Sequence, residues 1–232
     1  MYGYRSKIGL IVPSINMAIE PEFSAMAPEG VSIHTTRVPL SKGTLEGEKK
    51  MLEKNDEAVD IFKGTAIDIL VYACTTASVV KGRGWDEKLI EEVKNRIGIL
   101  ATTTIISVLE SLKKLEAKRI ALALPYPDEL NEMEKRYFEL EGFEITCMKG
   151  LGVTDMMDVS LEETYKLALD VDSKEADAVF ISCTGLRSLD LIDKLEKELN
   201  KPVISSNTAT MWNVLRMLGI DDPVEGYGRL FA

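Results

Sequence analysis

Two cysteines in matching phrases are the residues of this chain best suited to chemistry. Segment 67–76 reads IDILVYACTT, and segment 176–185, which reads ADAVFISCTG, aligns with it without a gap. In each copy an Asp precedes an apolar run, a small residue and a Cys-Thr pair, which predicts Cys74 and Cys183 at the carboxyl ends of two buried strands. Two thiols at equivalent points of two equivalent halves can face one site.

We expect a helix to begin directly after each cysteine. At such a junction the free backbone N–H groups and the helix dipole stabilise a thiolate and can hold a substrate carboxylate. Thr75, Thr76 and Thr184 add hydroxyl donors, and Gly185 lets the backbone approach a ligand closely. Burial in a core would be the simpler explanation for one such cysteine, but the matched pair favours a functional role.

Polar residues follow a proline at the end of the first strand of each half. The two segments are Pro-Ser-Ile-Asn at 13–16 and Pro-Tyr-Pro-Asp at 125–128. Ser14, Asn16 and Tyr126 would therefore line a cleft beyond the strand ends, where hydroxyl and amide groups can bind a ligand. Helix capping explains Ser14 and Asn16 almost as well, and the same ambiguity applies to Ser-Ser-Asn at 205–207.

Other candidates carry weaker signals. His34, the only histidine, has polar neighbours in a predicted strand and is expected to face solvent. Cys147 has no counterpart in the other half and is expected to be structural. Three widely spaced cysteines are too few for a zinc site, so we expect no metal. No Gly-x-Gly-x-x-Gly motif follows the first strand, which argues against a dinucleotide cofactor.

Composition restricts the class of protein. The chain has 232 residues, of which 45% are hydrophobic and 28% charged, and its formal charge is −10. These values are typical of a globular protein, and the acidity disfavours nucleic-acid binding, which needs a basic surface. A small anionic substrate remains compatible, because a local cluster of backbone amides can bind a carboxylate. Without a signal peptide or membrane span, we expect a cytoplasmic protein with reduced thiols and no membrane partner.

Short β-branched runs alternate with amphipathic stretches, the pattern of a parallel sheet covered by helices on both faces. Strands are predicted near 7–12, 31–37, 67–73, 97–101, 118–124, 143–149, 177–182 and 202–206. Helices are predicted near 16–27, 45–63, 86–95, 103–116, 127–141, 160–171, 187–199 and 207–218.

The repeat extends beyond the two cysteines. Segment 7–13, KIGLIVP, matches segment 119–125, RIALALP, and each half then continues with the same order of helices and strands. We therefore predict two pseudo-symmetric Rossmann-like α/β halves, 1–112 and 113–232, each a mostly parallel sheet flanked by helices. The ligand site should lie in the cleft between them, beyond the carboxyl ends of the strands.

Several motifs in this order resemble those of the Asp/Glu racemase superfamily, within its maleate cis-trans isomerase and arylmalonate decarboxylase branch. They are GLIVPSIN at 9–16, YACT at 72–75, Pro-Tyr at 125–126, SCT at 182–184 and Ser-Asn at 206–207, and together they span almost the full length. The resemblance implies one catalytic cysteine from each half on opposite sides of the substrate. It also implies that neither a metal nor an organic cofactor takes part.

Carried over by position, the resemblance implies that Cys74 is a nucleophile, Cys183 an acid/base, and that Asn16 and Tyr126 bind substrate carboxylates. It points to a cofactor-independent isomerase acting on a small dicarboxylate, assembled as a homo-oligomer, a dimer or tetramer. An amino-acid or hydantoin racemase, an arylmalonate decarboxylase-like enzyme and a non-catalytic carboxylate-binding protein remain alternatives. Met156 departs from the isomerase pattern, which has an Asn there, and this leaves the exact substrate open.

Overall fold

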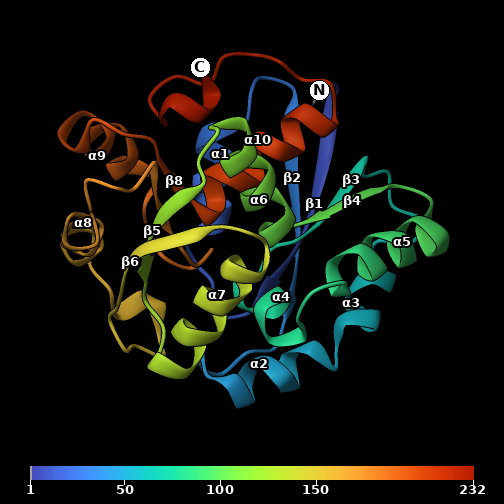
Figure 1. Ribbon diagram of the computed structural model, residues 1–232. Helices are drawn as coiled ribbons and strands as arrows, with labels where there is room; N and C mark the ends of the chain where they lie inside the picture. The colour runs from blue at the N-terminus through green and yellow to red at the C-terminus, as the bar shows by residue number, and fades with distance from the viewer. Residues whose placement is uncertain (1) are drawn as a thin grey trace.

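Two four-stranded parallel sheets form the framework of the protein (Figure 1). The structure is a computed structural model that describes residues 2–232. The first sheet has the order β2-β1-β3-β4 and the second the order β6-β5-β7-β8, with every neighbouring pair parallel. The strands are β1 (Ser6–Pro13), β2 (Val31–Val38), β3 (Ile69–Tyr72), β4 (Leu100–Thr103), β5 (Arg119–Leu124), β6 (Glu144–Gly150), β7 (Ala178–Ile181) and β8 (Val203–Ser205). The predicted pair of pseudo-symmetric α/β halves is confirmed.

Ten α-helices within residues 2–232 connect and cover these strands. They are α1 (Ile19–Met26), α2 (Leu45–Leu52), α3 (Asn55–Asp60), α4 (Thr75–Lys81), α5 (Trp85–Ile97), α6 (Thr104–Lys114), α7 (Asp128–Leu140), α8 (Leu161–Asp170), α9 (Ile192–Leu199) and α10 (Ser206–Met217). None of the helices in the described part of the chain has the length and apolarity that crossing a bilayer requires.

Three helical predictions need correction. The helix predicted over 45–63 is two helices, and the break places the buried Asn55 where its Oδ1 accepts a hydrogen bond from the Tyr72 hydroxyl at 2.6 Å. A helix was expected to begin after Cys74, and α4 does so, but the predicted helix ranges leave out 75–81 because TTASVVK consists largely of weak helix formers without a helical period. The helix predicted from residue 187 begins only at Ile192, after a single 3₁₀ turn at Leu189–Leu191.

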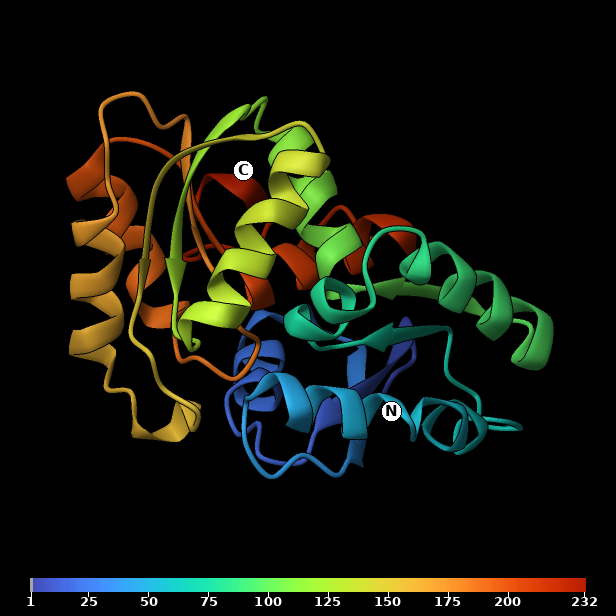
Figure 2. The same ribbon diagram turned by 60° about the horizontal axis from the view of Figure 1, so that its bottom comes forward.

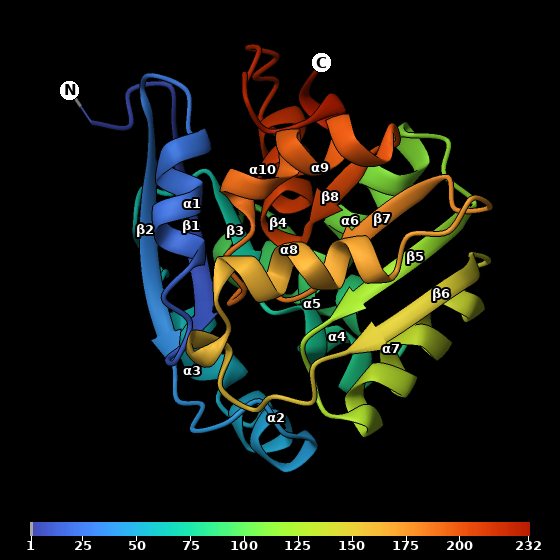
Figure 3. The same ribbon diagram turned by 90° about the vertical axis from the view of Figure 1, so that its left-hand side faces the viewer.

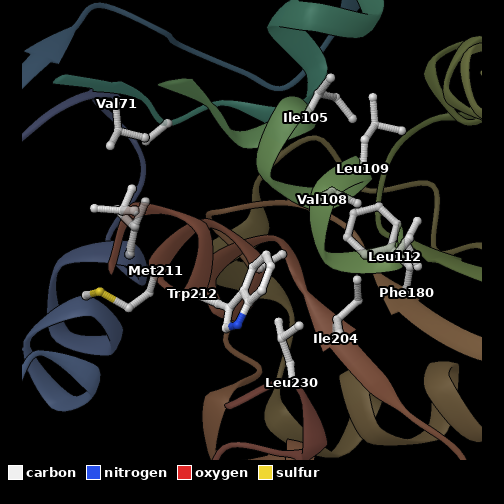
Figure 4. Packing of buried hydrophobic residues seen from close by; sticks show 14 of the residues in the cluster. Val71, Ile105, Val108, Leu109, Leu112, Phe180, Ile204, Met211, Trp212 and Leu230 are labelled. Atoms are coloured by element: carbon white, nitrogen blue, oxygen red, sulfur yellow. The ribbon is translucent and has the colours of Figure 1, made fainter. Parts of the chain in front are cut away.

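A continuous apolar core joins the two halves. Helices α6 and α10 pack against each other, and their buried side chains meet residues from both sheets (Figure 4). Ile105, Val108 and Leu112 of α6 lie close to Phe180 of β7 in this core. Because the core spans both halves, it fixes the position of one sheet's carboxyl ends relative to the other's.

The remaining helices cover the outer faces (Figure 2). Helices α2, α3 and α5 bury a second apolar cluster against the N-terminal sheet, and α8 and α9 bury a third against the C-terminal sheet. Figure 3 shows α8 lying across the outer face of β5 and β7, with α7 on the opposite face of that sheet. The inner strands β1, β3, β5 and β7 are thus covered on both faces, which explains their nearly uninterrupted apolar runs.

The Asp of each repeated phrase has a structural role. Asp68 accepts hydrogen bonds from the backbone N–H of Lys7 at 2.7 Å and from the Ser6 hydroxyl at 3.2 Å. Asp177 accepts from the backbone N–H of Arg119 at 2.9 Å and from the guanidinium of the same residue at 2.8 Å. Each Asp therefore ties the start of the cysteine-bearing strand to the start of the first strand of its half.

Candidate functional site

A small pocket lies beyond the carboxyl ends of the strands and receives side chains from both halves. Its volume is about 390 Å³ when the open space at its mouth is included. Cys74 and Cys183 both line it, together with Asn16, Tyr126, Gly185 and the three threonines that follow the cysteines. The structure thus brings together all the predicted site residues except one.

Ser14 is the exception. Its hydroxyl donates to the Leu40 carbonyl at 3.1 Å and accepts from the Leu40 backbone N–H at 3.0 Å. It therefore joins the end of β1 to the segment after β2 and is not among the residues that line the pocket. The two other weak candidates also lie outside: His34 is exposed and hydrogen-bonds Ser32, while Cys147 is half-buried in β6.

Cys74 immediately precedes α4, as predicted, but its thiol is buried deeply. The sulfur lies 3.3 Å from the Thr76 hydroxyl and 3.6 Å from Oε2 of Glu48. Burial, followed by the nearby Glu48 carboxyl, raises the pKa of Cys74 well above its usual value, and hydrogen bonds from Thr76 and the Ala77 backbone offset only part of this. The expected stabilisation of a thiolate by the helix start is therefore outweighed by desolvation.

Cys183 has a different backbone setting from the one predicted. Among the described residues no helix begins directly after it; a turn closed by the Leu186 N–H on the Cys183 carbonyl follows instead. Its φ of 90° lies in a region that side chains rarely adopt, which is typical of residues held under strain at functional sites. Burial raises the pKa of Cys183 to about 11, although the Tyr126 hydroxyl and the Gly185 N–H lower it in part.

The two halves exchange hydrogen bonds directly beside the cysteines. The Asn16 amide donates from Nδ2 to the Thr184 hydroxyl at 3.0 Å, and that hydroxyl donates to the Ala73 carbonyl at 3.0 Å. Oδ1 of Asn16 accepts hydrogen bonds from the backbone N–H groups of Ala18 and Ile19 at the start of α1, which is the helix-capping role considered above. Asn16 also lines the pocket. Thr75 similarly bonds Ser206 at 2.9 Å. The residues on both sides of Cys74 and the residue after Cys183 are thereby held in place across the two halves.

A buried carboxylate that the sequence did not reveal, Glu22, supports the turn after Cys183. Its Oε1 accepts from the backbone N–H of Ser188 at 2.7 Å and of Leu189 at 3.0 Å, and its Oε2 accepts from the Asn207 amide at 2.7 Å. Asn207 also donates to the Thr184 carbonyl at 3.1 Å. Burial raises the pKa of Glu22, and these three hydrogen bonds lower it in part.

Two further buried glutamates lie near the thiols. Burial raises the pKa of Glu48 in α2 to about 7, against hydrogen bonds from Thr76 and Cys74 that lower it. Burial raises the pKa of Glu134 in α7 to about 8. Neither residue differs in its sequence neighbourhood from other charged positions on a predicted helix, so no local pattern identifies them.

Met156 closes one side of the pocket. It is buried at the start of a 3₁₀ turn, Met156–Asp158, and lines the pocket beside Gly43 and Gly185. A Cβ at Gly185 would lie 3.6 Å from the Met156 side chain, and a Cβ at Gly43 would lie 3.2 Å from its terminal methyl group. Leu40 and Met156 add apolar side chains to a pocket whose polar lining includes Asn16 and the threonines.

The arrangement can support acid, base and nucleophilic chemistry by sulfur. Two thiols from different halves share one small pocket, and a carboxyl and hydroxyl groups within hydrogen-bond distance can exchange protons with them. Residues 2–232 contain no group of three or more His, Cys, Asp or Glu side chains arranged to hold a metal ion.

A duplicated parallel α/β fold with paired thiols in its interlobe pocket defines an enzyme of the two-cysteine class found in the Asp/Glu racemase superfamily. The family model described as arylmalonate decarboxylase matches residues 8–231, and the chain belongs to this family.

Relatives in the family carry two different activities. Maleate isomerase of Nocardia farcinica is 32% identical over 237 residues, which cover 97% of this chain and 94% of the relative. Arylmalonate decarboxylase of Bordetella bronchiseptica is 28% identical over 231 residues, which cover 94% and 96%. Similar solved structures include a Cys-to-Ser mutant of the N. farcinica maleate cis-trans isomerase, which carries a covalently bound succinylcysteine intermediate. It has a TM-score of 0.93 and 30% sequence identity to this protein, and the match covers 97% of this chain and 98% of that one.

Proposed function

We propose that this protein is a cofactor-independent isomerase that converts a small cis-unsaturated dicarboxylate into its trans isomer. The observation that carries the proposal is the presence of two thiols in the wall of one pocket, the buried Cys74 from one half and the half-buried Cys183 from the other. Support also comes from the N. farcinica maleate isomerase, whose solved structure carries a succinyl group on a cysteine.

In the proposed mechanism Cys74 is the nucleophile. Its sulfur adds to one alkene carbon, and the π electron pair moves to the neighbouring carbon, where the attached carboxylate delocalises it. The thiol of Cys183 donates a proton to that carbon, which gives a succinyl group attached to Cys74 by a carbon–sulfur bond, and the former alkene bond is now a single carbon–carbon bond. After rotation about the carbon–carbon bond, Cys183 removes a proton from the same carbon and the Cys74 sulfur leaves, which releases the trans product. Atoms and charge balance over the cycle.

The remaining pocket residues would orient the substrate. The Asn16 amide and the Tyr126 hydroxyl can donate to a carboxylate, and Thr75, Thr76, Thr184 and Gly185 surround the two sulfurs. The apolar wall at Met156 would contact the carbon skeleton. We therefore include both maleate and a methyl-substituted maleate as test substrates.

Proton NMR in deuterated buffer tests the proposal, because it reports isomerisation, solvent exchange and decarboxylation together. We expect conversion of a cis diacid to its trans isomer by the wild-type protein. Cys74→Ala and Cys183→Ala should each abolish it, whereas Cys147→Ala, a change of the third cysteine outside the pocket, should leave it intact. Wild-type protein that leaves both substrates unchanged would refute the proposed function.

A further inference from the structure

Glu48 is the acidic side chain that the described residues contribute to the pocket wall, and the proposed reaction leaves it without a role. It belongs to α2, and its carboxyl is turned away from solvent, with 2% of the residue exposed. Its Oε2 accepts a hydrogen bond from the Cys74 thiol at 3.6 Å. A carboxylate in this place contacts the sulfur that must lose a proton before or during attack.

The structure holds this carboxyl firmly against Cys74. Thr44 caps α2 by accepting from the Gly47 N–H at 3.2 Å, and the Glu48 N–H donates to the Thr44 carbonyl at 2.9 Å. The loop before α2 is itself attached to the other half, because the Gly43 N–H donates to the Thr154 carbonyl at 2.8 Å. Contacts between α2 and α4 then place Glu48 beside the start of α4.

Other groups around Cys74 are poor proton acceptors. The hydroxyl of Thr76 is only weakly basic, and the Tyr72 hydroxyl donates to Asn55. Cys183 and Glu134 belong to the second half, where Cys183 handles the carbon-bound proton in the proposed reaction. The lysines of α2, Lys49 and Lys50, are exposed and do not line the pocket.

We propose that Glu48 is the base that accepts the Cys74 proton as the sulfur attacks the substrate. The S–H bond breaks, its proton moves to Oε2, and the sulfur electron pair forms the bond to carbon. When the sulfur leaves the product, the proton returns from Glu48 to Cys74. This step rests on the proposed function for the identity of the electrophile, but the proton exchange between the two side chains does not.

The carboxyl also affects binding of the dianionic substrate. An ionised Glu48 in the pocket wall repels a carboxylate, and transfer of the Cys74 proton neutralises it at the moment when the substrate is held. The same proton transfer therefore activates the nucleophile and removes a like charge from the pocket.

Glu48→Gln separates this role from a structural one, because the amide has the same size but cannot accept the proton. General base catalysis contributes a factor of roughly 10²–10⁴, so kcat at pH 7.5 should fall by about 100-fold or more. Glu48→Asp should recover part of the loss. Glu46→Gln, an exposed position on the same helix, is the matched control and should keep the wild-type kcat.

Alkylation of Cys74 by iodoacetamide, followed by peptide mass spectrometry without substrate, gives the second readout. In the wild type the rate should rise with pH, level off near pH 7 as Glu48 ionises and suppresses the thiolate, and rise again at high pH. In Glu48→Gln the break near pH 7 should vanish, so that alkylation at pH 8.5 becomes faster although turnover is slower. The half-buried Cys147 serves as an internal reference.

Each outcome has a distinct meaning. Wild-type kcat in Glu48→Gln, or identical alkylation profiles in the two proteins, would overturn the assignment of Glu48. If neither diacid is turned over but the alkylation break near pH 7 is present and depends on Glu48, the proposed function fails while the proton exchange stands.

Discussion

Glu134 provides a quantitative test of how burial controls ionisation beside the site. It lies fully buried in α7, and its two carboxyl oxygens have no hydrogen-bond partner among residues 2–232. Its counterpart in the first half is Glu22: each lies nine residues after the proline that ends its first strand, 13 to 22 and 125 to 134. Glu22 accepts three hydrogen bonds, so the duplicated position is satisfied in one half and unsatisfied in the other.

Ionisation of Glu134 should therefore cost stability. Burial raises its pKa from 4.5 to about 8. Between these values the folded state binds more protons at this site than the unfolded state, so stability falls as pH rises through the window, and the loss is complete above about pH 8. The slope is about 1.4 kcal/mol per pH unit, which gives up to about 5 kcal/mol for the whole window.

Urea unfolding of wild type and Glu134→Gln between pH 6 and 8.5 measures this directly. The free energy of unfolding of the variant, relative to that of the wild type, should increase by about 1.4 kcal/mol for each pH unit up to pH 8 and should stay constant above it. Glu139→Gln, at an exposed position of the same helix, should show no such trend. A stability difference between wild type and Glu134→Gln that is constant across this range would refute the reasoning.

Two further predictions concern the second thiol and the shared core. The Tyr126 hydroxyl lowers the pKa of Cys183, so Tyr126→Phe should raise that pKa above about 11 and slow alkylation of Cys183 at pH 9. Unchanged or faster alkylation would show that the hydroxyl does not stabilise the thiolate. Phe180→Ala should lower the free energy of unfolding, measured in urea, by about 3–5 kcal/mol, because the ring is fully buried in the core that joins the two halves. A loss below about 1 kcal/mol would mean that the core around this ring is loosely packed.

The sequence contained enough information for the framework because its signals are local and repeated. Apolar strands recur in both halves with the same order of helices, and buried parallel strands require such runs. The same repetition located both cysteines in one pocket. The strand end at Cys74 indicated that a helix begins there, but the extent of α4 was missed because residues 75–81 have weak intrinsic helical preference, and tertiary contacts with α2 and α7 favour the helix instead.

The details of the site depended on contacts between distant segments. Glu48 lies 26 residues before Cys74 in the sequence. Glu22 accepts a hydrogen bond from the backbone N–H of Ser188, which is 166 residues further along the chain. Nothing in the spacing of charged residues along a helix distinguishes these carboxyls from solvated ones. For the same reason the sequence predicted a stabilised thiolate at Cys74, whereas burial and the Glu48 carboxyl raise the pKa of this thiol.

The central claim is that Cys74 bonds covalently to the substrate while Cys183 moves the proton. The most direct measurement is intact-protein mass spectrometry, with peptide mapping, of Cys183→Ser after incubation with maleate or its methyl derivative. We predict a mass gain of one diacid located on Cys74, and no gain in the Cys74→Ser/Cys183→Ser double variant. An absence of adduct with both compounds, or an adduct located on Cys147 alone, would contradict the account.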